Sequence, residues 1–152
     1  MIRRATEADA PSLTALINLA FQVERFFLDS ERLVLAEVLD RLRKGFFLIE
    51  EADGRMAACV YVELRGDRAY LGLLSVDPSL QRAGLGKRLV AVAEEFARAA
   101  GSRHMDLNVV NLREELPPFY RKLGYSESGT SPFPSDVYTK LPCHFIQMSK
   151  PL

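Results

Sequence analysis

The sequence is short of several residue types, and each shortage narrows what the protein can be. It holds only two cysteines, Cys59 and Cys143, and only two histidines, His104 and His144. Neither histidine has a cysteine or carboxylate at metal-ligand spacing, so we expect no metal site. The two cysteines need not pair, which is typical of a reducing cytoplasm rather than of a disulfide-stabilised secreted domain.

The chain also lacks net charge and long apolar runs. Its 20 basic residues balance its 20 acidic ones, so no general electrostatic attraction to nucleic acid or anionic membrane is expected. No apolar stretch reaches the length of a signal peptide or membrane-spanning helix, which favours a cytoplasmic protein. With 152 residues, 48% of them hydrophobic, the sequence predicts one domain, residues 1–152, with a real core.

Hydrophobic periodicity divides the chain into strands and helices. A capping-box pattern, Thr6-x-x-Asp9, predicts the start of a first helix, and Pro117-Pro118 should interrupt the last one. Residues 126–142 are expected to be loop. The pattern predicts strands at residues 2–4, 46–50, 56–64, 70–76, 104–110 and 144–149, and further helices at 30–44, from 85 to 100, and from 111 onward.

A two-residue turn at Gly66-Asp67 predicts a hairpin whose register follows by counting. Glu63 then faces Tyr70 across the two strands, and Tyr61 faces Gly72. Because side chains alternate along a strand, one face should carry a set of six residues. These are Tyr61, Glu63, Tyr70, Gly72, Leu74 and Val76.

The most informative segment is the turn that joins the strand ending at Val76 to the helix beginning at Leu85. Gly84 and Gly86 lack Cβ atoms, so an anion can reach the main-chain N–H groups at the start of that helix. Arg88 follows Lys87 where a P-loop needs Ser or Thr. The spacing also lacks the third glycine of a dinucleotide-binding fingerprint. A phosphate ligand is expected, but neither ATP, GTP nor a nicotinamide.

The longer string Leu74-Ser75-Val76-Asp77-Pro78-x-x-Gln81-Arg82-x-Gly84-x-Gly86-x-x-Leu89 resembles the acetyl-CoA motif of the GNAT superfamily of N-acetyltransferases. The opening Ile2-Arg3-Arg4-Ala5-Thr6 and the late Phe119-Tyr120-Arg121-Lys122-Leu123-Gly124-Tyr125 resemble segments of the same family. The resemblance implies an α/β (α+β) fold with a mixed, mostly antiparallel central sheet of six to seven strands, flanked by helices and with splayed parallel central strands. It also implies a possible homodimer.

Acetyl-CoA is the co-substrate that the resemblance implies, held mainly by backbone. The main chain at Leu74 and Val76 would pair with pantetheine, and the turn would hold pyrophosphate. Asn111 lies near a cofactor-contacting asparagine of the family, although it could equally cap a helix. A ligand-free tight turn is the alternative for the whole motif. The expected cofactor residues are Leu74, Ser75, Val76, Gln81, Arg82, Ala83, Gly84, Leu85, Gly86, Lys87, Arg88 and Asn111.

Tyr120 matches the family's tyrosine that acts as general acid near the cofactor sulfur; the alternative is that it only packs in an aromatic cluster. Tyr70 stands where relatives often carry the basic carboxylate or histidine. Glu63, its cross-strand partner, is the replacement base, unless it is simply a solvated carboxylate. Deprotonating an alkylammonium at neutral pH costs about 4.6 kcal/mol, so some base or relay is needed.

The resemblance implies that the acceptor amine enters beside the first two helices. Phe26, Phe27 and Tyr61 are the expected substrate-binding residues, and Glu24, Asp29 and Glu31 could attract a cationic amine. The expected function is transfer of acetyl from acetyl-CoA to a small amine, a peptide N-terminus or a lysine, by direct attack in a ternary complex. The alternative is a catalytically inactive acyl-CoA-binding sensor of the same fold.

Overall fold

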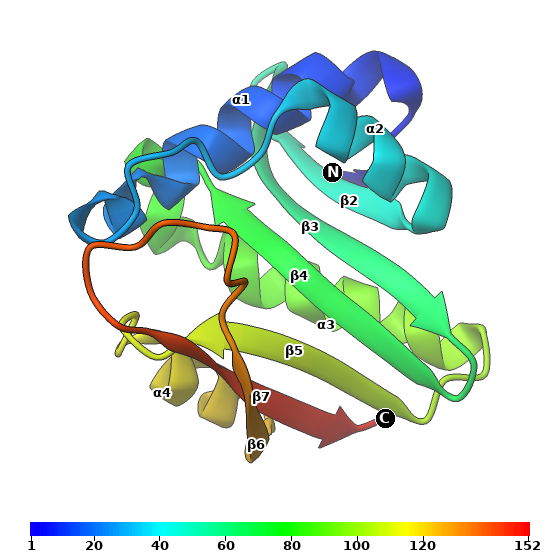
Figure 1. The fold of residues 1–152 in the computed structure, drawn as a ribbon. Helices are drawn as coiled ribbons and strands as arrows, with labels where there is room; N and C mark the ends of the chain where they lie inside the picture. The colour runs from blue at the N-terminus through cyan, green and yellow to red at the C-terminus, as the bar shows by residue number, and fades with distance from the viewer.

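The chain forms one seven-stranded sheet with helices on both faces, seen in a computed structural model (Figure 1). The structure describes the backbone of residues 1–152 and the side chains of residues 1–80 and 84–152. The strands are β1 (Ile2–Arg4), β2 (Phe46–Ala52), β3 (Arg55–Arg65), β4 (Arg68–Val76), β5 (His104–Val110), β6 (Ser126–Pro132) and β7 (His144–Pro151). The helices are α1 (Ala10–Ala20), α2 (Leu35–Lys44), α3 (Leu85–Ala99) and α4 (Leu116–Lys122), with 3-10 turns η1 (Glu7–Asp9), η2 (Phe21–Phe26) and η3 (Pro78–Ala83).

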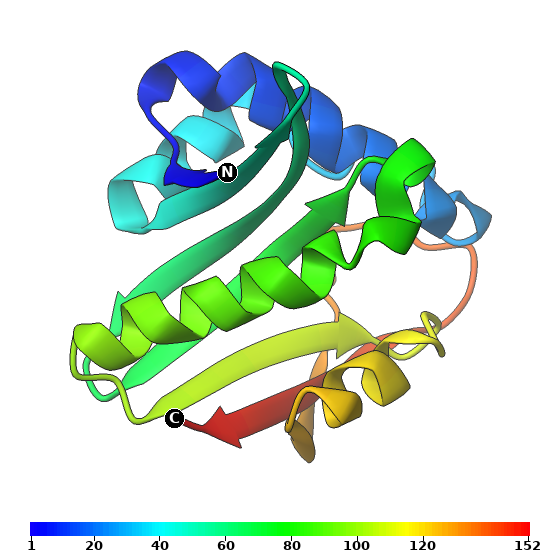
Figure 2. The ribbon, with the colours of Figure 1, turned by 180° about the vertical axis from the view of Figure 1, so that it is seen from behind.

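The sheet separates two apolar clusters. Helices α1 and α2 cover one face, where Leu13 and Ile17 pack against Phe47 and Tyr61. Helix α3 crosses the other face, and Leu89 and the rest of its buried stripe pack into the second cluster (Figure 2). No helix in the described chain is long and apolar enough to cross a membrane.

The strand order β1-β2-β3-β4-β5-β7-β6 confirms the expected mixed, mostly antiparallel sheet. Its only parallel neighbours among the described strands are β4 and β5, which pair from Arg68–Tyr70 to His104–Asp106. Beyond Tyr70 the pairing stops and the two strands diverge, as Figure 1 shows between their labels. The predicted splay is therefore confirmed, and main-chain groups of β4 face the gap.

The hairpin register is confirmed for four pairs, Leu64 with Ala69, Glu63 with Tyr70, Val62 with Leu71 and Tyr61 with Gly72. The predicted shared face is wrong beyond Gly72, because the register shifts there and Leu73 takes a φ of 54°. This bulge adds one residue to β4 and reverses the alternation. Leu74 and Val76 consequently face α3, whereas Leu73 packs with Tyr61 under α1 and α2.

Helix α2 begins at Leu35 rather than at Ser30. The Leu33 N–H donates to Asn18 Oδ1 at 2.9 Å, and the Leu33 carbonyl accepts from Asn18 Nδ2 at 2.8 Å. Because both main-chain groups of Leu33 are bonded to this side chain, they make no helical hydrogen bonds. Glu37 Oε1 then accepts the Val34 N–H at 3.0 Å and starts the helix.

Two other expectations need correction. The prolines Pro117 and Pro118 do not interrupt α4 but lie in its first turn, where a missing N–H costs nothing. The predicted loop at 126–142 contains β6, a polar edge strand with no apolar alternation to reveal it. Along α3 the buried stripe runs through Leu85, Leu89, Ala93 and Ala97, whereas Phe96 is 39% exposed.

Candidate active site

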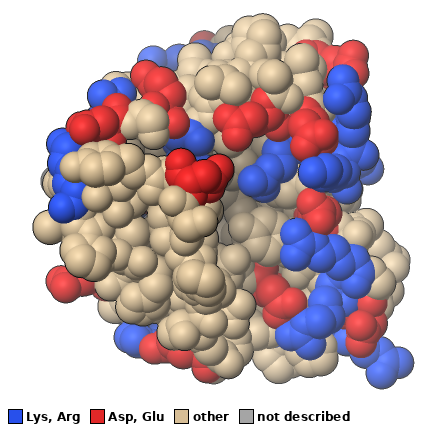
Figure 3. Space-filling view, viewed as in Figure 1, with Lys and Arg blue, Asp and Glu red and all other residues tan. Residues whose placement is uncertain are grey.

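A cleft of about 630 Å³ opens where β4 and β5 diverge. Its floor is formed by Tyr70, Leu74 and Val109 among others, and its walls come from η2, α2 and the segment around Phe133. Figure 3 shows this face hollowed near its centre, with acidic and basic side chains along the upper rim. The cleft thus lies at the carboxyl end of the parallel pair, where α/β sheets usually bind ligands.

The glycine turn leads into α3 beside this gap. Gly84 has a φ of 70°, a left-handed conformation that favours glycine. The first intrahelical bond joins the Arg88 N–H to the Gly84 carbonyl at 3.1 Å, so the N–H groups of residues 85–87 precede the ladder. The side chains of Gln81, Arg82 and Ala83 lie outside the described residues. The main-chain N–H groups of residues 85–87 form a set of hydrogen-bond donors that fits a phosphate.

Three other residues expected to bind the cofactor have side chains that already bond to groups within the protein. Arg88 reaches the buried carboxylate of Glu50 at 2.6 Å, so its charge is partly neutralised. Ser75 is buried, and its hydroxyl donates to the Leu73 carbonyl at 2.9 Å, leaving only its main chain for a ligand. Asn111 caps no helix: its Oδ1 accepts the His144 N–H at 2.8 Å and prolongs the pairing of β5 with β7.

Tyr120 lies on α4 and borders the cleft together with Tyr70. Its ring packs edge-on against Phe119 and Tyr125, with centroids 5.0 and 5.7 Å apart. Burial raises the pKa of Tyr120, Tyr70 adds to the rise, and Arg113 opposes it. Its hydroxyl makes no hydrogen bond to the groups that the structure describes. The phenol is therefore a protonated donor on a residue that lines the cleft.

Glu63 is the cross-strand partner of Tyr70, as predicted, but both oxygens of its carboxylate already accept hydrogen bonds. Tyr61 donates its hydroxyl to Oε1 at 2.6 Å, and Arg65 donates to Oε2 at 2.6 Å. The hydrogen bond from Tyr61 and the nearby arginines lower the pKa of Glu63, which makes it a weaker base. Neither Glu63 nor Tyr61 is among the residues that line the cleft.

Glu24 is the carboxylate that the sequence did not single out as a base. It lies on η2, is 5% exposed, and lines the cleft. Its Oε2 accepts a hydrogen bond from Arg113 Nη1 at 3.0 Å. Burial raises the pKa of Glu24 despite the attraction of Arg113. No pattern in the sequence separates this side chain from the solvated acids around it.

A family model described as the Acetyltransferase (GNAT) family matches residues 11–125. The chain belongs to this family. Over 129 residues it is 27% identical to a mycothiol acetyltransferase of Clavibacter michiganensis subsp. michiganensis, a match that covers 81% of this chain and 41% of the relative. The GNAT chain therefore spans about two fifths of the length of that relative.

Two further proteins are similar to this GNAT chain. A 5-NmdU N-acetyltransferase of Pseudomonas phage PaMx11 is 29% identical over 90 residues, covering 58% of this chain and 62% of the relative. The crystal structure of Ard1 from Thermoplasma volcanium superposes with a TM-score of 0.83 at 20% identity, covering 100% of this chain and 97% of that one. The last comparison shows the GNAT fold alone.

The GNAT family uses acetyl-CoA, and the described residues fit it. A Cβ on Gly86 would come within 3.7 Å of Leu74, Val76 and Phe119, so the turn packs closely on the strand that borders the gap. Main-chain donors at the turn suit a pyrophosphate, and the unpaired main chain of β4 suits an amide-containing arm. Among the described side chains, no group of His, Cys, Asp and Glu could hold a metal ion.

The aromatic residues expected at the acceptor lie away from the cleft in this GNAT chain. Phe27 is fully buried in a cluster with Leu28 and Val110. Phe26 is 50% exposed and packs edge-on against Phe27. The phenylalanines that do line the cleft are Phe21 on η2, Phe133 in the segment after β6, and Phe145 on β7.

Proposed function

We propose that this GNAT chain transfers the acetyl group of acetyl-CoA to a primary amine bound beside it in the same cleft. The observation that carries the proposal is that Tyr120 lines a cleft that opens between splayed β4 and β5. The names of the N-acetyltransferase relatives support it.

Acetyl-CoA would supply an activated thioester. The turn at residues 84–88 would hold its phosphates through main-chain N–H groups and the field of α3. The main chain of Leu74 and Val76 faces the gap and would pair with the arm that enters it. These are backbone roles, so most single side-chain changes there should affect binding weakly.

Glu24 is the base that we propose, directly or through a water. Removing a proton from an alkylammonium costs about 4.6 kcal/mol at neutral pH, and a carboxylate with a raised pKa recovers more of that cost. Glu63, the base expected from sequence, has a lowered pKa and lies outside the cleft lining. Tyr70 would border the amine without taking its proton.

The pH dependence of the rate distinguishes the two carboxylates. Glu24→Gln should lower kcat and displace the acidic limb of the pH-rate profile, because the group that must be ionised is gone. Glu63→Gln serves as the matched control and should leave that limb in place. A displaced limb in the Glu63 variant, with an unaltered one in the Glu24 variant, would reverse the assignment.

Tyr120 is the group that we propose to stabilise the departing thiolate. A phenol of pKa about 10 gives its proton to a thiolate, whose conjugate thiol has a pKa of about 8.5, at a cost of roughly 2 kcal/mol, and burial increases that cost. Tyr120 would therefore act first as a hydrogen-bond donor. Arg113, whose charge opposes the rise in the pKa of Tyr120, would keep that cost down.

The second candidate is an acyl-CoA-binding sensor without turnover, favoured by Tyr70 standing at the usual position of the base. Thiol release from acetyl-CoA, measured with a broad panel of amines, separates the two. Release that depends on an added amine supports the enzyme. Calorimetric binding of acetyl-CoA with no amine-dependent thiol supports the sensor.

We also propose that the chain is a single cytoplasmic domain that forms a homodimer and binds neither nucleic acid nor membrane. Light scattering on the purified chain tests the dimer. A monomer at micromolar concentration would contradict it.

A further inference from the structure

We infer that the acceptor is an amine that also carries an anionic group, and that Arg32 and Arg41 bind this group in the wall of the cleft. The inference deepens the proposed function and rests on it. It differs from the expectation that acidic residues draw in a purely cationic amine.

The observation that carries the inference is the state of the two arginines. Arg41, on α2, lines the cleft half-buried, with its guanidinium 5.1 Å from the ring centroid of Tyr61. Arg32 lines the same wall half-buried, 5.4 Å from the ring centroid of Phe21. Within the described side chains, neither arginine has a carboxylate at salt-bridge distance. Two cations therefore face the cleft from one wall.

The carboxylates nearby in sequence or on the same wall already have other partners. Glu63 accepts from Tyr61 and Arg65, Glu24 from Arg113, and Glu37 from the Val34 N–H, while Glu31 pairs with Arg25 and Asp29 with Lys140. Three acidic residues were expected from the sequence to attract a cationic amine, and each is thus paired with an arginine or a lysine. They are Glu24, Asp29 and Glu31. Their attraction for a free cation is largely cancelled.

Stacking prepares both guanidinium groups for an anion. A guanidinium over an aromatic face keeps its N–H donors at its edge, where they match the two oxygens of a carboxylate or phosphate. Such charge-assisted pairs are about twice as strong as neutral hydrogen bonds. Glu24 attracts Arg32 and Glu63 attracts Arg41 only from beyond salt-bridge distance, so a bound anion would give each arginine a direct partner.

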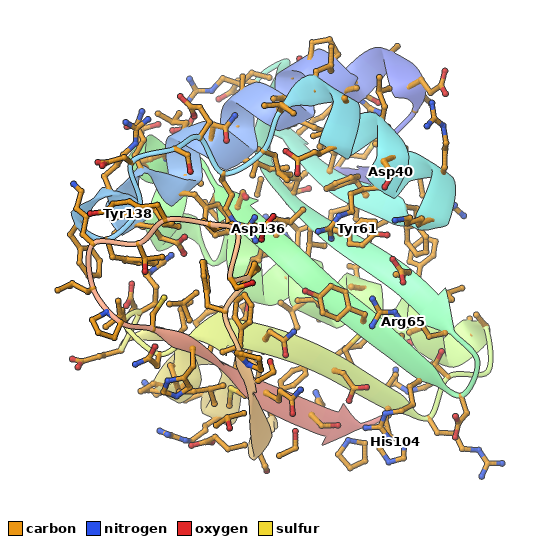
Figure 4. All side chains as sticks on the ribbon, in the orientation of Figure 1. Asp40, Tyr61, Arg65, His104, Asp136 and Tyr138 are labelled. Atoms are coloured by element: carbon orange, nitrogen blue, oxygen red, sulfur yellow. The ribbon has the colours of Figure 1, made fainter. Side chains whose placement is uncertain are left out.

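The opposite wall carries a carboxylate. Asp136, on the segment after β6, is exposed and lines the cleft. Figure 4 shows Asp136 reaching from this segment over β4, with Tyr61 beyond it under α2. A cleft lined by Asp136 and Glu24 as well as by the two arginines suits a molecule with an ammonium at one end and an anion at the other.

The test compares acceptors that differ only in the anion. Glycine, β-alanine and 4-aminobutyrate are assayed against their primary amides, and 3-aminopropyl phosphate against 3-aminopropanol, by thiol release from acetyl-CoA. At least one anionic member should exceed its neutral partner in kcat/KM by about tenfold, as expected for one net charge-assisted pair of about 1.4 kcal/mol.

The variants assign that preference to the arginines. Arg41→Gln and Arg32→Gln should raise KM for the preferred anionic acceptor about tenfold, with a smaller effect on kcat, and bring the anionic-to-neutral ratio toward one. Arg43→Gln is the matched control, because Arg43 is an exposed arginine of α2 outside the cleft lining. A wild-type preference for the neutral members, or an equal effect of Arg43→Gln and Arg41→Gln, would overturn the inference.

Failure of the proposed function is separable from failure of this inference. If no amine releases thiol, the transferase proposal fails and the anion site is read from binding alone. Calorimetric titration of 4-aminobutyrate and 4-aminobutyramide into the wild-type and Arg41→Gln proteins, with coenzyme A present, provides that reading. Preference for the acid that disappears in the variant supports the site, and equal binding of the two compounds refutes it.

Discussion

Tyr120 and Tyr125 are neighbouring buried tyrosines whose hydroxyl groups face different surroundings, so one substitution can be made at each with opposite consequences. The Tyr120 hydroxyl borders the cleft and pairs with no described group. The Tyr125 hydroxyl donates to Glu94 Oε2 at 2.8 Å, inside the cluster under α3. Each Tyr→Phe change removes one oxygen and keeps the ring.

For Tyr120→Phe we expect a loss of rate without a loss of stability. A hydrogen bond to a charged group is worth about 1.5–3 kcal/mol, which corresponds to a fall in kcat of roughly 10- to 150-fold if that bond forms to the departing thiolate. The free energy of unfolding should change by less than about 0.5 kcal/mol, because no bond is broken in the free protein. Affinity for coenzyme A should stay within about twofold.

For Tyr125→Phe we expect the reverse. The change leaves one oxygen of Glu94, a side chain only 6% exposed, without its donor, at a cost of about 1–3 kcal/mol. Lys150 still pairs with the other oxygen at 2.9 Å, so the fold should persist and kcat should hold. Urea unfolding and steady-state thiol release measure both quantities. If Tyr120→Phe keeps kcat within threefold of wild type, or destabilises the protein as much as Tyr125→Phe does, the assigned role of Tyr120 is wrong.

Two further predictions concern stability. Hydrogen bonds from Arg3 lower the pKa of Asp9 to about 2, so Asp9→Asn should destabilise the protein at neutral pH. Because solvent screens the half-exposed Arg3, we expect the substitution to lower the free energy of unfolding by about 1 kcal/mol. This difference between wild type and variant should be present above pH about 4 and should disappear as the pH falls toward 2. Urea unfolding across that pH range measures it. A Cβ on Gly45 would lie 2.3 Å from the Val62 carbonyl oxygen, so Gly45→Ala should cost about 1–3 kcal/mol. Gly129→Ala, which meets only a movable side chain, should cost less; equal melting temperatures for the two variants would refute this.

The hairpin shows how far the sequence could lead. A two-residue turn at Gly66-Asp67 fixes its register by counting, and the four predicted pairs are confirmed. The count fails at Leu73, because leucine there takes a left-handed φ without any glycine to announce it. Such a residue costs about 1–2 kcal/mol of strain, which the surrounding fold must supply. A bulge enforced by tertiary contacts leaves no mark in local sequence.

The candidate site likewise has one part that the sequence predicts and one part that it does not. The donor side rests on main-chain groups in a glycine-spaced turn, and such a turn can be predicted from the sequence alone. The acceptor side depends on side chains from η2, α2 and a late segment that meet only in the folded chain. Glu24 and Arg113 are 89 residues apart, and nothing in either neighbourhood indicates the other. Their pairing, and the burial that raises the pKa of Glu24 against it, arise only when the chain folds.

The bulge at Leu73 also decides how one strand can serve both sides. Before it, Tyr70 and Gly72 face α1 and α2, on the side where the acceptor would enter. After it, Leu74 and Val76 face α3, on the side of the phosphate-binding turn. Regular alternation would have kept Leu74 with Tyr70, and its side chain would then have stood in the path of the amine. We therefore expect the thioester of the proposed reaction to lie beside Leu73, where β4 changes faces and which lines the cleft together with Tyr120.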